Sequence, residues 1–154
     1  MTPLFKKLNY KNQSTIFILN APDSFNAEID AMREVAVVKT DVAKAKDIPF
    51  VLAFVTKLKE VESFASKLKQ MYKDDEVIWL AYPKLSSKKY TCEFNRDTGW
   101  QALGDIGFEG VRMVAIDEDW SALRFRRAEN IKTIIRSFAM SKKGREKSTP
   151  KRRK

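Results

Sequence analysis

The stretch Phe50–Thr56 reads FVLAFVT, and Val77–Tyr82 reads VIWLAY. Both stretches are short and continuously apolar, which is typical of strands that are buried on both faces of a parallel sheet. Between them, apolar residues recur at helical spacing from Val61 to Tyr72, with lysines on the other side of the predicted helix. A strand, a helix and a second strand in this order predict a right-handed parallel crossover.

The same alternation continues on both sides of this unit. Further strands are predicted over Thr15–Asn20, Ala36–Thr40, Val111–Asp117 and Leu123–Arg127, and further helices carry the apolar sets Phe25–Met32, Trp100–Ile106 and Ile131–Phe138. Residues 42–49 fit either a helical turn or a loop. The last two strands are expected to pair as an antiparallel hairpin, which adds one antiparallel strand at the edge of the sheet. Helix caps are predicted at Asp23 or Ser24, at Thr56 and at Thr98, and Gly107 is expected to end a helix.

These elements predict a three-layer, Rossmann-like α/β domain over residues 1–140, with a mostly parallel sheet and an antiparallel C-terminal hairpin strand. The length of 154 residues is enough for one such domain. Residues 141–154 have no apolar side chain other than Pro150 and are predicted to be a disordered basic tail.

Charge is concentrated in that tail. The chain has 30 Lys and Arg against 20 Asp and Glu, a formal charge of +10, and the tail contributes +7 of it. Its basic residues form a candidate contact for nucleic acid or another polyanion: Lys142, Lys143, Arg145, Lys147, Lys151, Arg152, Arg153 and Lys154. The tail has no aromatic residue for base stacking, so such a contact would not distinguish sequences. A tail without any specific partner is the alternative.

Composition also excludes several classes of function. The chain has no histidine and a single cysteine, Cys92, which excludes Ser-His-Asp and Cys-His catalysis, zinc-type sites and an internal disulfide. The lone cysteine fits a reducing cytoplasm. No apolar stretch approaches the roughly 20 residues that span a bilayer, and no secretory signal is expected at the start. No metal, cofactor or catalytic residue is predicted, and the oligomeric state stays open.

The loop after the first strand argues against nucleotide cofactors. Nucleotide-binding folds of this class carry glycines there, so that the backbone can approach a pyrophosphate. This chain has Asn20-Ala21-Pro22 at that place, with neither a dinucleotide-binding nor a Walker A motif. A methyltransferase cofactor is disfavoured for the same reason, and Ala81-Tyr82-Pro83 only weakly resembles the polar-Pro-Pro-aromatic motif of amino-methylating enzymes.

A ligand site is expected at the carboxyl ends of the strands, near the switch in strand order. Thr56-Lys57 is one candidate loop, and the candidate residues in the other loops and the final hairpin are Asn20, Ser24, Lys84, Ser86, Ser87, Lys88, Asp117, Asp119, Trp120 and Arg124. Each group has a structural alternative. The lysines after Pro83 can belong to a solvated loop, the carboxylates can form a hairpin turn with Trp120 packed over the sheet edge, and Arg124 and Arg126 can pair with those carboxylates.

Three segments together resemble a small bacterial family of single-domain proteins, of the Bacteroidetes type, known as a domain of unknown function. They are Leu80–Lys84, Phe94–Trp100 and Val114–Arg126, and the opening Leu4–Leu8 and Leu19–Pro22 fit the same pattern. The resemblance covers the body of the chain without the tail and implies a bacterial cytoplasmic protein. It implies no activity.

Two functions follow as hypotheses. The first is a non-catalytic binding or regulatory module whose partner is anionic, either nucleic acid or a phosphate-bearing ligand. The second is an enzyme or small-ligand binder at the carboxyl edge of the sheet.

Overall fold

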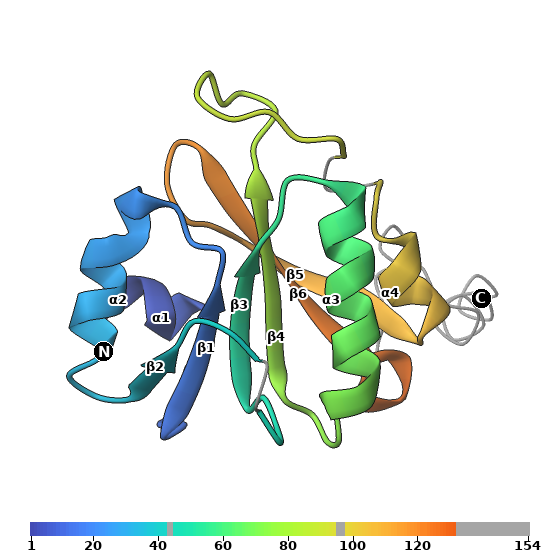
Figure 1. Cartoon of the computed structure of the whole chain (residues 1–154), viewed down its shortest axis with the longest axis horizontal. Coiled ribbons are helices and arrows are strands. Elements are labelled where there is room, and N and C mark those ends of the chain that lie inside the picture. The colour runs from blue at the N-terminus through green and yellow to red at the C-terminus, as the bar shows by residue number, and fades with distance from the viewer. Residues whose placement is uncertain (43–44, 95–97, 132–154) are drawn as a thin grey trace, which may run out of the picture.

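The computed structural model describes residues 1–42, 45–94 and 98–131. They form a six-stranded sheet in the order β2-β1-β3-β4-β6-β5 (Figure 1). The strands are β1 (Thr15–Leu19), β2 (Val37–Lys39), β3 (Phe50–Phe54), β4 (Val77–Pro83), β5 (Phe108–Ala115) and β6 (Trp120–Arg127). The helices are α1 (Pro3–Lys7), α2 (Asn26–Met32), α3 (Leu58–Met71) and α4 (Gln101–Asp105), with short 3-10 turns η1 (Asp23–Phe25) and η2 (Ala128–Asn130).

The two apolar stretches lie side by side at the centre of the sheet, as predicted. β3 and β4 are parallel, with Leu52 opposite Trp79 and Ala53 opposite Leu80. Every residue of both strands is buried. β1 is parallel to β3 and β2 is parallel to β1, so four neighbouring strands point the same way. This explains why these stretches are apolar at every position rather than at alternate ones.

The final hairpin differs from the prediction in one respect. β6 is antiparallel to both β4 and β5, but it lies between them, and β5 takes the edge of the sheet. The antiparallel strand is therefore internal and not at the edge. The reason is apolar content on both faces, because Trp120, Ala122, Leu123 and Phe125 of β6 are all buried.

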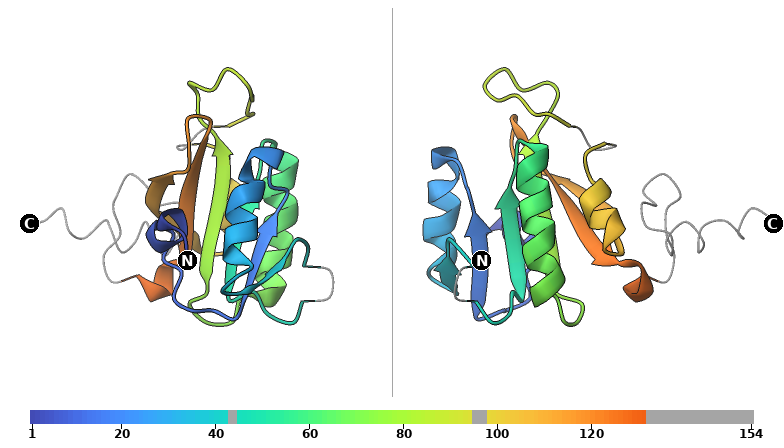
Figure 2. Two further views of the ribbon diagram at one scale, coloured as in Figure 1. Left: turned by 90° about the vertical axis from the view of Figure 1, so that its left-hand side faces the viewer. Right: turned by 45° about the vertical axis from the view of Figure 1, so that its right-hand side comes forward.

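Helices cover the two faces of the sheet and complete the three layers (Figure 2). α3 and α4 pack on one face through residues such as Phe64, Leu68 and Leu103. α1 and α2 pack on the other face through Phe5, Ile29 and Met32. Because α2 follows β1 and α3 follows β3, the chain leaves these two adjacent strands toward opposite faces. The switch in strand order therefore lies between β1 and β3.

Helix starts were predicted less well than strands. Neither Asp23 nor Ser24 caps a helix, since η1 begins after Pro22 without a side-chain cap and α2 continues from it. The N-cap of α3 is Lys57 rather than Thr56, and α4 begins after Trp100 without a side-chain cap rather than at Thr98. The predicted C-terminal glycine of α4 is confirmed, because Gly107 has a φ of 90° directly after the helix.

Some predictions lie outside the described residues. These are the helix that follows Ile131, the domain boundary at residue 140 and the basic tail. Among the described residues, no helix is long and apolar enough to cross a bilayer.

Candidate functional site: the cleft between β1 and β3

A cleft of about 490 Å³ opens at the switch point between β1 and β3. Its floor is apolar and comes from both strands and α3: Leu19, Ala53, Val55 and Phe64. Its rim is polar and is formed by Asn20, Lys57, Lys59, Glu60, Ser63 and Lys67. The position agrees with the rule that open α/β sheets bind ligands beyond the carboxyl ends of their strands.

The rim is cationic. Lys57, Lys59 and Lys67 are exposed, and all three come from α3 or its N-cap. Among the described residues that line the cleft, Glu60 is the one carboxylate, and its Oε1 atom accepts hydrogen bonds from the backbone N–H groups of Thr56 at 2.8 Å and Lys57 at 3.1 Å. That carboxylate therefore already serves the start of the helix, and none of the three lysines forms an ion pair with a described residue.

The start of α3 offers few free donors to an anion. Besides the two N–H groups that Glu60 accepts from, the N–H group of Leu58 donates to Oε1 of Glu93 at 2.8 Å. A phosphate in the cleft would therefore meet lysine ammonium groups rather than the exposed backbone of a helix end.

Asn20 is the predicted site residue that lines this cleft. It follows β1 directly and has a φ of 58°, in the left-handed region that asparagine tolerates better than most residues. This conformation turns the chain from β1 toward η1. Ser24 is exposed in η1 and is not among the residues that line the cleft.

The remaining predicted residues come together at a different place, the junction of the loop after β4 with the β5–β6 turn. The N–H group of Lys84 donates to the carbonyl oxygen of Asp119 at 2.8 Å, and Oγ of Ser87 donates to Oδ1 of Asp119 at 2.9 Å. Oδ1 of Asp117 accepts from the N–H groups of Asp119 and Trp120, both at 2.8 Å. Both carboxylates thus have structural hydrogen bonds, which agrees with the hairpin-turn alternative. No group of acidic or cysteine side chains suited to a metal ion occurs among the described residues.

Trp120 packs over the edge of the sheet, again as its structural alternative predicts. Its ring lies 5.0 Å from that of Phe54 and 4.9 Å from that of Tyr90, measured between centroids. Its Nε1 atom is buried and has no hydrogen-bond partner in the described parts of the chain. Ser86 and Lys88 are exposed on the loop after β4, which projects beyond the sheet (Figure 1).

Arg124 does not join these residues, contrary to the expectation that placed it at the carboxyl edge. It lies in the middle of β6 opposite Trp79, several residues from the turn. The predicted pairing of Arg126 with Asp117 or Asp119 is also wrong, because Arg126 pairs with Asp75 at the opposite end of β4. β6 begins at Trp120 rather than at the predicted Leu123, so both arginines lie well inside the strand and away from the turn.

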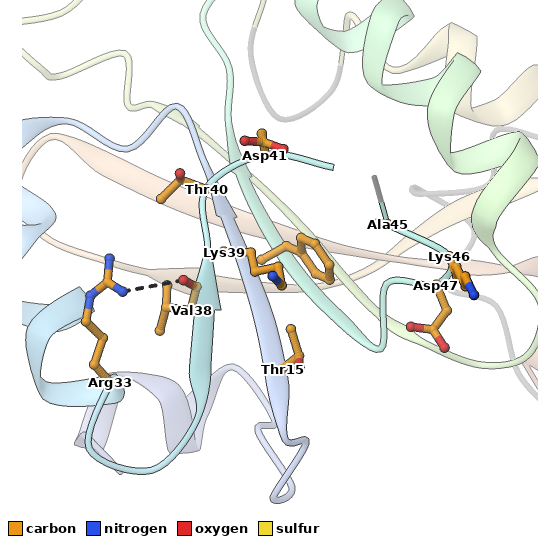
Figure 3. A pocket seen from close by; sticks show the side chains of 10 residues that line it. Thr15, Arg33, Val38, Lys39, Thr40, Asp41, Ala45, Lys46 and Asp47 are labelled. Carbon is orange, nitrogen blue, oxygen red and sulfur yellow. Dashed lines mark hydrogen bonds between the residues drawn. The ribbon is translucent and has the colours of Figure 1, made fainter. Parts of the chain in front are cut away.

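A second hollow of about 710 Å³ adjoins the same face of β1 (Figure 3). Phe17, two residues before Leu19, contributes to its wall together with Thr15, Arg33, Lys39, Asp41 and Lys46. Ala45 and Asp47 also line this hollow.

Sequence analysis missed most residues of the cleft. Lys59, Ser63 and Lys67 belong to the helix whose lysines are predicted to lie on the side away from the sheet, and Lys57 is predicted only as part of a candidate loop. The available signal was the spacing of Lys59, Ser63 and Lys67 at i, i+4 and i+8, which places the three on one side of the helix that follows the strand.

The comparisons with known proteins identify the fold. Neither protein-family models nor curated proteins give a match. Among solved structures, a SAM-dependent methyltransferase from Aquifex aeolicus is similar with a TM-score of 0.52 and 12% sequence identity, covering 79% of this chain and 86% of that chain. A protein of the NADB-Rossmann superfamily from Streptococcus agalactiae gives a TM-score of 0.45 and 11% identity, covering 82% of this chain and 68% of that chain. The chain thus has a Rossmann-like α/β fold of the kind found in methyltransferases.

Proposed function

We propose that the protein binds a small organic anion in the cleft between β1 and β3. The ligand class is a molecule with an apolar body and a phosphate or carboxylate group. One observation carries the proposal: the cleft at the strand-order switch has an apolar floor and three lysines on its rim.

The chemistry of the cleft supports this ligand class. A volume of about 490 Å³ suits a small metabolite and falls within the usual range of ligand pockets. Leu19, Val55 and Phe64 are buried, so an apolar group placed on them would be removed from water. Lysine ammonium groups bind phosphates and carboxylates as point charges, and the Asn20 amide can donate or accept beside them.

Methyl transfer from S-adenosylmethionine is the second candidate, because the fold likeness to the Aquifex aeolicus enzyme covers most of both chains. The cofactor would occupy the same edge of the sheet. Two features weigh against it. The loop Asn20-Ala21-Pro22 has no glycine for a close approach of the cofactor, and the lysine rim repels the positive sulfonium group.

Calorimetric titration and thermal-shift measurements on the full chain test both candidates. The probes are AMP, inorganic phosphate, S-adenosylmethionine and S-adenosylhomocysteine, each at low ionic strength. We expect AMP to raise the melting temperature, and the K57Q/K67Q variant to bind it at least tenfold more weakly. The K69Q/K73Q variant removes two charges outside the cleft and is expected to bind as the unchanged chain does.

The outcomes separate the candidates. Saturable binding of S-adenosylmethionine without binding of AMP or phosphate would favour methyl transfer and contradict the anion proposal. Equal losses in the two double variants would show an effect of overall charge, and the cleft would then not be the site.

A further inference from the structure

The face of the sheet that α1 and α2 cover changes character along β5 and β6. Near the carboxyl edge it is apolar, through Val114, Trp120 and Ala122. Toward the other end the same face carries Arg112 and Arg124, and then Arg126. Strand alternation places these arginines on one side, because they follow Trp120 and Ala122 at even spacing.

Arg112 and Arg124 lie directly opposite each other in the β5–β6 register. Side chains in such a pair start about 5 Å apart, and like charges in this arrangement destabilise the sheet. Neither guanidinium makes a hydrogen bond or ion pair with any residue in the part of the chain that the structure describes, and the buried Nε atom of Arg124 is without a partner. Arg126 differs, because Asp75 binds it through both carboxylate oxygens.

The electrostatics around Arg124 show the same lack of compensation. Burial lowers the pKa of its guanidinium, and the charges of Arg126 and Arg112 lower it further, whereas Asp75 acts in the opposite direction. An anion between Arg112 and Arg124 would relieve this repulsion and supply acceptors for both.

More positive charge lies close by on the same face. The indole N–H of Trp79 donates to the carbonyl oxygen of Leu8 at 2.8 Å, and Trp79 is the neighbour of Arg124 in the sheet. The end of α1 is therefore held beside Arg124, and its last turn carries the exposed Lys6 and Lys7. We call Lys6, Lys7, Arg112 and Arg124 the basic face.

The described chain ends beside the edge strand of the sheet. Ile131 packs against Ala128 and Val111, beside β5 at the edge of the sheet. The sequence beyond it includes the +7 segment Ser141–Lys154.

We propose that the basic face binds the phosphate backbone of nucleic acid without reading its sequence. Two guanidinium groups opposite each other can both donate to one phosphate, and arginine binds phosphate through paired donors. None of the exposed large apolar residues in the described chain lies on β5 or β6, so the strand part of this face lacks the groups that insert into a lipid surface. The absence of exposed aromatic rings on it leaves the backbone as the feature recognised.

Fluorescence anisotropy with a labelled single-stranded RNA and a labelled DNA duplex tests the proposal, using the full chain at several KCl concentrations. The variant is R112Q/R124Q, and the charge-matched control is K46Q/K69Q, whose residues lie on the α3 side of the sheet. We expect R112Q/R124Q to weaken binding about tenfold or more at low salt. We also expect this variant to make the slope of log K against log salt shallower, by the amount that corresponds to about one phosphate contact. The control is expected to change affinity less than twofold.

Further arms identify the partner. K151Q/R152Q/R153Q/K154Q is expected to lower the salt slope further and independently of R112Q/R124Q. Circular dichroism melts confirm that the variants are folded, and R112K/R124K restores part of the affinity if charge at this position is what binds.

Equal losses in R112Q/R124Q and its control would overturn the proposal, as would binding to anionic lipid vesicles in place of nucleic acid. AMP binding in the β1–β3 cleft is measured separately and is expected to be unchanged in R112Q/R124Q.

Discussion

Oγ of Ser87 donates a hydrogen bond to Oδ1 of Asp119 at 2.9 Å and joins the loop after β4 to the turn between β5 and β6. Ser87 also accepts hydrogen bonds from the N–H groups of Lys89 and Tyr90. Tyr90 in turn lies against Trp120. The hydroxyl of Ser87 thus helps to hold the loop after β4 against the β5–β6 turn, together with the hydrogen bond from the N–H group of Lys84 to the carbonyl oxygen of Asp119.

We expect Ser87→Ala to destabilise the protein by about 1–2 kcal/mol, because it removes one charge-assisted hydrogen bond and leaves two backbone donors without an acceptor. Urea unfolding measures the change. Asp119→Ala should cost a similar amount, and the double variant should cost less than the sum by about 1 kcal/mol. Strict additivity of the two changes would mean that the Ser87–Asp119 bond contributes nothing.

The ion pair between Arg126 and Asp75 makes stability depend on pH. Burial raises the pKa of the Asp75 carboxyl, but the hydrogen bonds and charge of Arg126 outweigh it and hold the pKa below its ordinary value of 3.8. The ionised carboxylate therefore stabilises the folded chain above that value, and the contribution is lost as the pH falls through the lower pKa of the folded state.

Asp75→Asn is accordingly expected to lower the free energy of unfolding near pH 6, and the difference from the unchanged chain should shrink as the pH falls below about 4. Urea unfolding at several pH values provides the measurement. Asp74→Asn, at the exposed neighbouring residue, is the control and should follow the unchanged chain. A difference for Asp75→Asn that persists undiminished at pH 2 would contradict the assignment.

Two glycines with the same backbone angle should respond differently to alanine. Gly99 and Gly107 both have a φ of 90°. A Cβ at Gly99 would overlap the side chain of Phe94 and lie 3.2 Å from Cδ2 of Leu58, whereas a Cβ at Gly107 meets nothing within 4 Å. We expect Gly107→Ala to cost about 1–2 kcal/mol from backbone strain alone. Gly99→Ala should cost at least twice as much, and thermal unfolding of the two variants gives the comparison. Equal losses would mean that the loop around Phe94 yields to the added methyl group.

The fold was largely predictable because its central strands are continuous apolar runs, which is the pattern of strands buried on both faces. Phe50–Phe54 and Val77–Pro83 contain almost no polar residue, and such segments have few stable places outside the centre of a parallel sheet. The sequence of β6 holds only part of the signal for its internal position, namely apolar residues on both faces. Pairing order is decided by which edge the hairpin meets, and a local pattern of alternation does not contain that information.

The candidate site was less predictable, for a physical reason. Asn20 follows a strand end directly, so its place at the carboxyl edge follows from the topology. Lys59 and Lys67 lie along a helix, and whether a helical lysine faces solvent or a cleft depends on the crossing of that helix over the sheet. Arg124 was misplaced because it lies four residues after Trp120, the first residue of β6, and β6 runs away from the carboxyl edge. Four residues of a strand span more than 10 Å.

The last prediction concerns the side chain that satisfies the backbone N–H groups at the start of α3. The residue predicted from the sequence for this role differs from the one found in the structure. Thr56 was the predicted cap, but Glu60 accepts hydrogen bonds from the N–H groups of both Thr56 and Lys57, and Oγ1 of Thr56 merely donates to the same carboxylate at 3.2 Å. Glu60→Ala is therefore expected to cost about 1–2 kcal/mol, and Thr56→Ala about 0.5 kcal/mol.

Urea unfolding at neutral pH distinguishes the two, with Glu62→Ala as the matched control on the exposed side of the same helix. Glu60→Gln keeps an acceptor oxygen in place and should recover part of the loss, because the hydrogen bonds survive without the charge that favours the N-terminal end of the helix dipole. A larger loss for Thr56→Ala than for Glu60→Ala would show that the threonine hydroxyl is the true cap, and that the carboxylate of Glu60 is free to compensate the lysines of the cleft.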